Sequence, residues 1–415
     1  HSVTFLPPSC WLARGSLPRR LDSEPVCSRH SAIIPTQIPD PMGTSSSSHP
    51  STSAAALLSR RSTSARGVSA SRGARTSSAA NRGSSEYTRR AHHAGSWYDS
   101  SSSILDAELS GYLHDASGDG GGGDASGCQG RPRALVSPHA GFRYSGPTAA
   151  YAYLALREAL SLSRGEGRPT TVVVLHPSHH VRLDGCAVSG STVLETPISN
   201  LNVDAELRSE LLGTGDFLTM DRHIDEAEHS GEMQYPYIAK AIVDAAQGRA
   251  GGERDDTVLE CRVLPIMVGA LGTSAERRFG RILAPYLSRP EVFTVVSSDF
   301  CHWGRRFGYA PNGEGSPRQH NEIAEYIEWL DRQGMNQIEL QRPGAFADYL
   351  RTYSNTICGR HPIGVWLHAL AANREAGRET TDVRFVRYAQ SGRVKNMDES
   401  SVSYASAVAR ISMAS

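Results

Sequence analysis

Three runs of strand-forming apolar residues in this chain each lead into a side chain that can bind a metal ion. The runs at residues 134–137, 171–175 and 292–297 lead, in that order, to His139, His179 and Cys301. Open α/β sheets bind small ligands along the edge formed by the carboxyl ends of their strands. The pattern therefore predicts a sheet whose edge carries one site with two histidines and a cysteine.

The first 86 residues differ in composition from the rest of the chain. They contain 10 Arg, no Lys and 4 acidic residues among dense Ser and Ala, a composition that cannot form a packed core. We expect a disordered leader, which we interpret either as an organellar transit peptide or as an extension without function. The remaining residues carry 33 basic and 39 acidic side chains, and this acidic balance argues against a nucleic-acid partner.

Residues 87–415 are expected to form an α/β domain. From residue 133 onward, apolar strand patterns alternate with helical ones, which predicts a mixed or mainly parallel sheet with helices on both faces. Residues 118–130 form a glycine-rich insertion. The sequence contains no apolar run long enough for a membrane span. Its seven cysteines have no CxxC spacing, so a reducing, cytoplasmic environment is expected.

The metal chemistry depends on His139, His179 and Cys301. Two neutral imidazoles with one anionic ligand are typical of non-haem iron sites, which keep open positions for other ligands. A thiolate binds iron, copper or zinc strongly and loses its proton when it does so. The alternative for each histidine is a structural hydrogen bond, and for Cys301 it is a buried small hydrophobe.

A cluster of acidic residues surrounds His229 near the start of a helix expected over residues 228–246 and broken or bent at Pro236. Such clusters are usually solvated charges that the helix dipole favours. In the alternative, one or two of Glu228, His229 and Glu232 face the metal site, where they orient its ligands or act as a general base. We favour His229 for that role, with Asp225 behind it.

Seven segments carry a resemblance to a known family. They are HAGSWY at 93–98, PHAG at 138–141, PSHH at 177–180, EHS at 228–230, SSDFCHWG at 297–304, NTICGRHPIG at 355–364 and SSVSYA at 400–405. In this order they resemble the Memo family, named for mediating ErbB-driven cell motility. The resemblance covers residues 88–411 and implies a single Memo-like domain.

The resemblance implies a fold similar to the class III extradiol dioxygenases. It also implies one iron or copper ion at His139, His179 and Cys301, with His229 nearby. The dioxygenases use two histidines and a glutamate, so a cysteine here argues against ring cleavage. The family implies a role in intracellular redox chemistry and in binding phosphotyrosine peptides near the same cleft.

Five further residues are predicted to line that cleft. Arg360 and His361 stand at the start of a helix, where they would meet an anion, and Trp97, Tyr98 and His180 would contact substrate or peptide. The alternatives are a buried structural pairing of Arg360 with a carboxylate and a packing role for Trp97 and Tyr98. Three functions remain open: a metal-dependent redox protein, a phosphopeptide adaptor with a vestigial site, and a hydrolase with Cys301 as nucleophile.

Overall fold

The computed structural model describes residues 87–118, 130–247, 259–312 and 320–411, together with the backbone of Thr4 and Phe5. The predicted leader, residues 1–86, therefore lies outside the described residues except for strand β1 (Thr4–Phe5). This strand pairs antiparallel with β5 (Val181–Arg182). Most of the predicted glycine-rich insertion, residues 119–129, also lies outside them.

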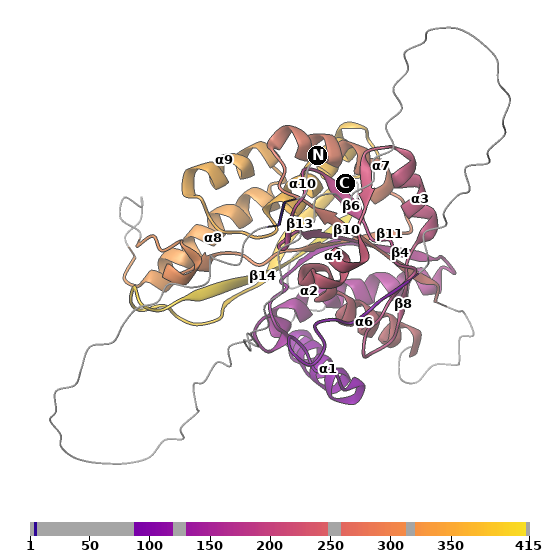
Figure 1. Ribbon diagram of the computed structural model, residues 1–415, viewed down its shortest axis with the longest axis horizontal. Helices are drawn as coiled ribbons and strands as arrows, with labels where there is room; N and C mark the ends of the chain where they lie inside the picture. The colour runs from indigo at the N-terminus through magenta and orange to yellow at the C-terminus, as the bar shows by residue number, and fades with distance from the viewer. Residues whose placement is uncertain (1–3, 6–86, 119–129, 248–258, 313–319, 412–415) are drawn as a thin grey trace, which may run out of the picture. The chain divides into compact units, whose positions relative to one another are not determined.

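A nine-stranded mixed sheet organises the described domain (Figure 1). Its strand order is β12-β14-β3-β11-β4-β10-β6-β9, and β13 pairs with β14. The four strands in the middle run parallel; they are β3 (Pro132–Ser137), β11 (Val292–Ser297), β4 (Thr170–Pro177) and β10 (Cys261–Val268). The flanking strands are β14 (Ser401–Ile411), β13 (Thr381–Gln390), β12 (His302–Trp303), β6 (Cys186–Val188) and β9 (Phe217–Thr219).

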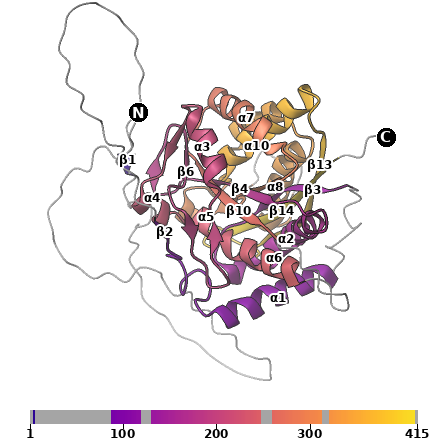
Figure 2. The same cartoon turned by 90° about the vertical axis from the view of Figure 1, so that its right-hand side faces the viewer.

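Helices cover both faces of this sheet (Figure 2). One face is covered by α1 (Ser102–Gly118), α2 (Phe142–Gly165) and α6 (Tyr235–Gln247), and the other by α7 (Thr273–Leu287) and α10 (Arg360–Glu375). Every residue of β3, β4 and β11 is buried, as parallel strands between two helix layers require. The predicted fold class, a mixed sheet with helices on both faces, is confirmed.

The remaining elements are short or lie at the periphery of the sheet. They are β2 (Thr88–Arg89), β7 (Val193–Leu194), β8 (Leu201–Asn202), α3 (Ala205–Gly213), α4 (Arg222–Ala227), α5 (His229–Glu232), the 3-10 helix η2 (Arg305–Phe307), α8 (Ile323–Glu339) and α9 (Pro343–Tyr353). Strands β2, β7 and β8 form a separate three-stranded sheet.

The helix predicted over residues 228–246, with a break or bend at Pro236, is divided in the structure shortly before that proline, between α5 and α6. Glu228 has extended backbone angles and caps α5, with its side chain accepting a hydrogen bond from the Ser230 amide. Pro236 lies in the first turn of α6, where the missing amide hydrogen costs nothing. The division places the Glu228 carboxylate beside the site instead of on a continuous helix surface.

Candidate metal centre

Three neighbouring parallel strands end at the same edge of the sheet and deliver polar side chains there. His139, His179 and Asp299 each stand two residues beyond the last residue of β3, β4 and β11. Because β11 lies between β3 and β4 and runs parallel to both, these three residues meet at one edge. The prediction that His139 and His179 converge follows from this register, and the structure places their rings 5.3 Å apart between centroids.

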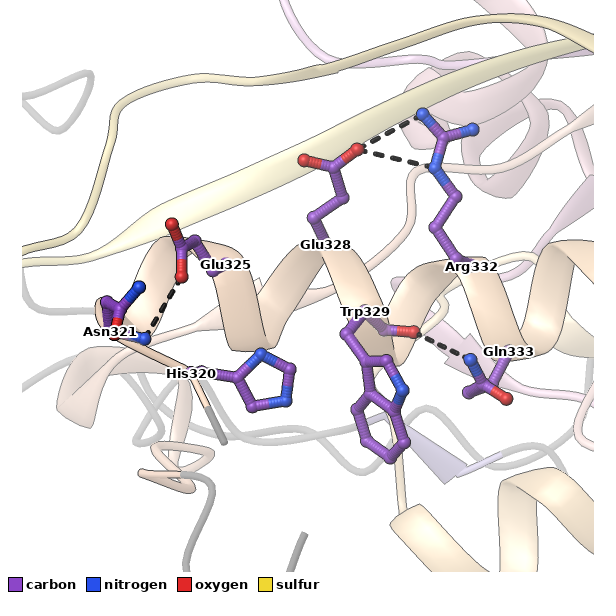
Figure 3. Close-up of a pocket in the computed structure, with 7 residues that line it drawn as sticks. All are labelled: His320, Asn321, Glu325, Glu328, Trp329, Arg332 and Gln333. Atoms are coloured by element: carbon purple, nitrogen blue, oxygen red, sulfur yellow. Dashed lines mark hydrogen bonds and ion pairs between the residues drawn. The ribbon is translucent and has the colours of Figure 1, made fainter. Parts of the chain in front are cut away.

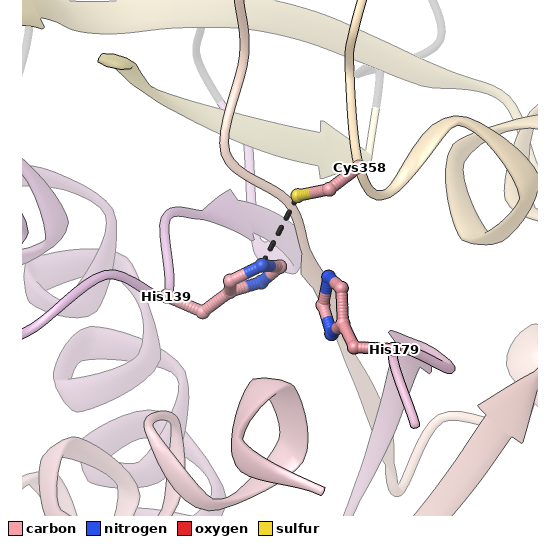
Figure 4. Close-up of side chains that lie close together, drawn as sticks. All are labelled: His139, His179 and Cys358. Carbon is pink, nitrogen blue, oxygen red and sulfur yellow. Dashed lines mark hydrogen bonds between the residues drawn. The ribbon is translucent and has the colours of Figure 1, made fainter. Parts of the chain in front are cut away.

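The thiol that joins the two histidines belongs to Cys358 (Figure 4). Its Sγ lies 3.1 Å from Nε2 of His139, and ligand atoms of His139, His179 and Cys358 all lie within 4.8 Å of one another. A tetrahedral ion with bonds of about 2.1 Å to nitrogen and about 2.3 Å to sulfur separates its ligand atoms by about 3.5 Å. Two imidazoles and one thiol at this spacing fit iron, copper or zinc.

Cys358 reaches the edge on the loop between α9 and α10. The next residue, Gly359, packs against the end of β11, and its amide donates to Ser298 Oγ at 3.1 Å. A Cβ at Gly359 would lie 2.4 Å from Ser298 Cβ and 2.5 Å from Ser297 O. Only glycine allows this approach of the two backbones, and the approach carries the Cys358 thiol to the histidines.

Cys301 does not belong to this group, so the predicted ligand set is corrected from Cys301 to Cys358. Cys301 lies four residues beyond β11, where the chain has left the edge and pairs with β14 through the Ser403 amide, which donates to Cys301 O. Its own amide donates to Asp331 Oδ1 at 3.3 Å. Burial and the Asp331 carboxylate raise the pKa of the Cys301 thiol, which is the opposite of what a nucleophilic cysteine needs.

Glu228 holds His179 at two points. One carboxylate oxygen accepts the His179 backbone amide at 2.6 Å, and the other contacts Nδ1 at 2.8 Å. A carboxylate only accepts hydrogen bonds, so Nδ1 carries a proton and Nε2 is the atom turned to the site. Burial would raise the pKa of Glu228, but His179 holds it well below its usual value. In turn, Glu228 and Cys358 overcome burial and raise the pKa of His179 to about 10.

The His139 ring is held by a neutral hydroxyl, whereas the His179 ring is held by a carboxylate. The backbone amide of His139 donates to Asp299 Oδ1 at 2.8 Å, and its Nδ1 lies 2.8 Å from Ser297 Oγ. Burial, together with His179 and His229, lowers the pKa of His139 well below its usual value, so the ring is neutral. Burial raises the pKa of Asp299 to about 7.

His229 lies over the two ligand histidines. Its ring stacks on His179 at 4.5 Å between centroids, packs against Trp97 at 4.5 Å and meets His139 edge-on at 5.5 Å. Burial and His179 lower the pKa of His229 well below its usual value. Its nearest carboxylate is Glu228, with Oε1 3.5 Å from His229 Nδ1. The predicted support from Asp225 is therefore replaced by support from Glu228.

Asp225 belongs to a buried charge network centred on Arg89. The Arg89 guanidinium contacts Asp225 Oδ1 at 3.0 Å and Glu232 Oε2 at 2.6 Å, and all three side chains are almost completely buried. Glu232 in turn accepts the backbone amide of His93 at 2.7 Å and contacts its Nδ1 at 3.0 Å. Glu232 thus holds His93 in the way that Glu228 holds His179.

The other predicted cleft residues have different surroundings. Tyr98 is buried and donates its hydroxyl to Glu232 Oε1 at 2.8 Å, so it stabilises the charge network. His180 is exposed, with its ring 6.1 Å from that of His229. Arg360 is exposed and donates to Ile357 O, and His361 pairs with Glu276 on α7 at 2.7 Å. Of these four residues, only His180 has a ring contact with His229.

A separate hollow lies along α8 and contains none of the metal-site residues (Figure 3). It has a volume of about 530 Å³ and is lined by His320, Asn321, Glu325, Glu328, Trp329, Arg332 and Gln333. Glu328 and Arg332 form an ion pair one helical turn apart at its rim.

Comparison with known proteins identifies the family. Residues 89–408 match the family described as Memo-like protein. The chain belongs to the Memo family. It is 41% identical over 318 residues to MEMO1 of Homo sapiens, which covers 76% of this chain and 95% of that protein. It is also 41% identical over 327 residues to the memo-1 homolog of Caenorhabditis elegans, a match that covers 79% of this chain and 83% of that protein.

Among solved structures, an uncharacterized Escherichia coli K12 protein, JW3007, is similar with a TM-score of 0.39. The identity is 14%, and the match covers 66% of this chain and 99% of that one. Within the ranges of this Memo-family chain that the structure describes, none of the helices combines the length and apolarity needed to cross a bilayer.

The sequence reasoning missed Arg89, His93 and Cys358. It did group Glu228 and Glu232 with His229 as side chains that could orient the site, and in the structure Glu228 contacts His179 and Glu232 contacts His93. Cys358 was available as a signal, because it stands within a family segment and directly before a glycine.

Proposed function

We propose that this Memo-family protein holds one iron or copper ion at His139, His179 and Cys358, and acts in intracellular redox or metal handling and in motility-type signalling. The observation that carries the proposal is the convergence of two imidazoles and a thiol within 4.8 Å at the carboxyl edge of the sheet. Iron or copper bound there would supply one-electron exchange, whereas zinc fits the donors but has no redox chemistry.

The protein's own side chains prepare the site for such an ion. Glu228 and Ser297 orient the two rings from behind, because a metal-binding histidine needs its second nitrogen occupied by a hydrogen-bond partner. His229 stacks on the His179 ring, and Trp97 packs against the outer His229 ring; together they limit the access of water to the site.

The test measures metal bound to the purified full chain after reconstitution with Fe²⁺ or Cu²⁺. We expect about one equivalent in the wild type and a loss in Cys358→Ser. Cys301→Ser is the matched control and should bind as the wild type does. Less than about a tenth of an equivalent in the wild type would contradict the proposal, as would loss of binding in Cys301→Ser alone.

A second candidate is an adaptor that binds phosphotyrosine peptides without catalysis. It is favoured by the half-buried Trp97 ring, which packs against His229 beside the metal site. We expect Trp97→Ala to weaken binding of a phosphotyrosine peptide about tenfold, because the contact between the phosphotyrosine ring and the Trp97 ring is lost. An affinity equal to that of the wild type would exclude this role for the ring.

A further inference from the structure

We infer that Ser297 sets the tautomer of His139, placing the ring proton on Nδ1 and leaving the Nε2 lone pair turned toward Cys358 and the proposed ion. This inference rests on the proposed metal site for its functional meaning. Its structural content depends only on hydrogen bonds behind the ring, and it can be tested without metal.

The inference follows from counting protons at the Ser297 hydroxyl. A serine hydroxyl donates one hydrogen bond and accepts two. Its oxygen lies 2.7 Å from the carbonyl oxygen of Ser230. A carbonyl oxygen only accepts, and this one is buried, so the single Ser297 proton must be donated to it.

The lone pairs of the same hydroxyl then face two donors. Gln234 Nε2 donates to Ser297 Oγ at 2.9 Å, and His139 Nδ1 lies at 2.8 Å. Because the only proton of Ser297 is directed at Ser230, Nδ1 of His139 must be the donor in the second contact. In the tautomer with the proton on Nδ1, the other nitrogen, Nε2, carries the lone pair and lies 3.1 Å from Cys358 Sγ.

The orientation of the Gln234 amide is itself determined by its surroundings. Its Nε2 faces the carbonyl oxygen of Pro138 at 3.0 Å, and its Oε1 accepts from the Tyr153 hydroxyl at 2.7 Å. Turning the amide over would set two carbonyl oxygens against each other in a buried position. Gln234 therefore stays a donor to Ser297, and the hydroxyl cannot rotate its proton toward that side.

The consequence is a difference between the two metal-site histidines. His179 has an ionised carboxylate behind Nδ1, whereas His139 has a neutral hydroxyl whose proton is committed elsewhere. Both arrangements present Nε2 to the site, but only the one at His139 depends on the direction of a hydroxyl proton. Ser297 is thus a positioning residue that acts through His139.

The test reads the tautomer directly by ¹⁵N nuclear magnetic resonance of the metal-free full chain, with His139 assigned by comparison with His139→Gln. In the wild type we expect a protonated Nδ1 and an unprotonated Nε2. S297A removes the acceptor of the Nδ1 proton and should shift the ring toward the Nε2-protonated form. S297T keeps a hydroxyl and should restore the wild-type signals.

Ser406→Ala is the matched control, because Ser406 is equally buried but its hydroxyl donates to Thr148 O on α2 and not to a group at the metal site. A second readout is the affinity for Cu²⁺, which should fall about 10- to 100-fold in S297A and be restored in S297T. A wild-type ring protonated at Nε2 overturns the inference, whether or not S297A folds, and so does an unchanged tautomer in S297A.

The two readouts separate this inference from the proposed function. If the expected tautomers are found but the protein binds no metal, the proposed function fails and the inference stands. If the wild type binds metal and S297A keeps both the tautomer and the affinity, the inference alone fails.

Discussion

Replacing Arg89 by methionine should destabilise the fold strongly, because it leaves two buried carboxylates without their cation. Arg89 is 1% exposed, and its partners Asp225 and Glu232 are 2% and 0% exposed. Its guanidinium also donates to the backbone oxygens of Asp225 and Glu228. Removing one partner of a buried ion pair costs about 3–5 kcal/mol, which is a large part of the free energy of unfolding of a typical domain.

The same substitution should change how stability depends on pH. Burial would raise the pKa of Glu232, but His93 and Arg89 lower it to about 2. A carboxylate with a pKa below its unfolded value adds stability that is complete above the unfolded pKa and is lost as the pH falls toward the folded one. For Glu232 this amounts to about 3 kcal/mol, lost between roughly pH 5 and pH 2. Without Arg89 the pKa moves up, so the difference between variant and wild type should shrink as the pH is lowered.

Urea unfolding followed by tryptophan fluorescence at pH 6, 5 and 4 measures both effects. Arg90→Met is the matched control, because Arg90 is 66% exposed and meets Glu226 at 3.3 Å. Because Arg90 is exposed to solvent and Glu226 keeps its second partner, Arg222, losing this contact should cost about 0–1 kcal/mol. The reasoning is refuted if Arg89→Met costs no more than Arg90→Met, or if the difference from the wild type is the same at pH 6 and pH 4.

Three further predictions concern the metal site. Glu228→Gln should lower the affinity for Cu²⁺ about 10- to 100-fold, since the amide nitrogen of glutamine would face either the backbone amide or Nδ1 of His179, both of which donate to Glu228. An unchanged affinity in titration calorimetry would show that Glu228 does not orient His179 for metal binding. Metal affinity should rise between pH 6 and pH 8, by up to about tenfold per pH unit for each proton released on binding, because the pKa of His179 is raised to about 10 and burial raises the pKa of Cys358. Dissociation constants that chelator competition shows to be independent of pH would contradict this. Gly359→Ala should lower the free energy of unfolding by about 1–3 kcal/mol through overpacking and also weaken metal binding, since the new Cβ would lie 2.4 Å from Ser298 Cβ. Gly344→Ala is the control, because its Cβ meets nothing within 4 Å; equal effects of the two substitutions on thermal unfolding and metal content would argue against the close approach at Gly359.

Much of the fold could be predicted from local patterns. The strand at residues 292–297 was predicted with the bounds that β11 has. The long strand β14 was missed because its buried positions hold Ser and Ala among few β-branched residues, so it lacks the apolar signal of its neighbours. Helix α9 was missed as well.

By itself the sequence determined that His139 and His179 would meet, because each follows a buried strand at the same offset and parallel neighbours end at one edge of the sheet. Which cysteine joins them was decided only by the tertiary structure. Cys301 is close to a strand end in the chain, but four residues are enough to carry it along β14 and away from the edge. Cys358 is distant in the chain and is brought in by the contact of Gly359 with Ser298, a packing of two backbones that no local pattern encodes.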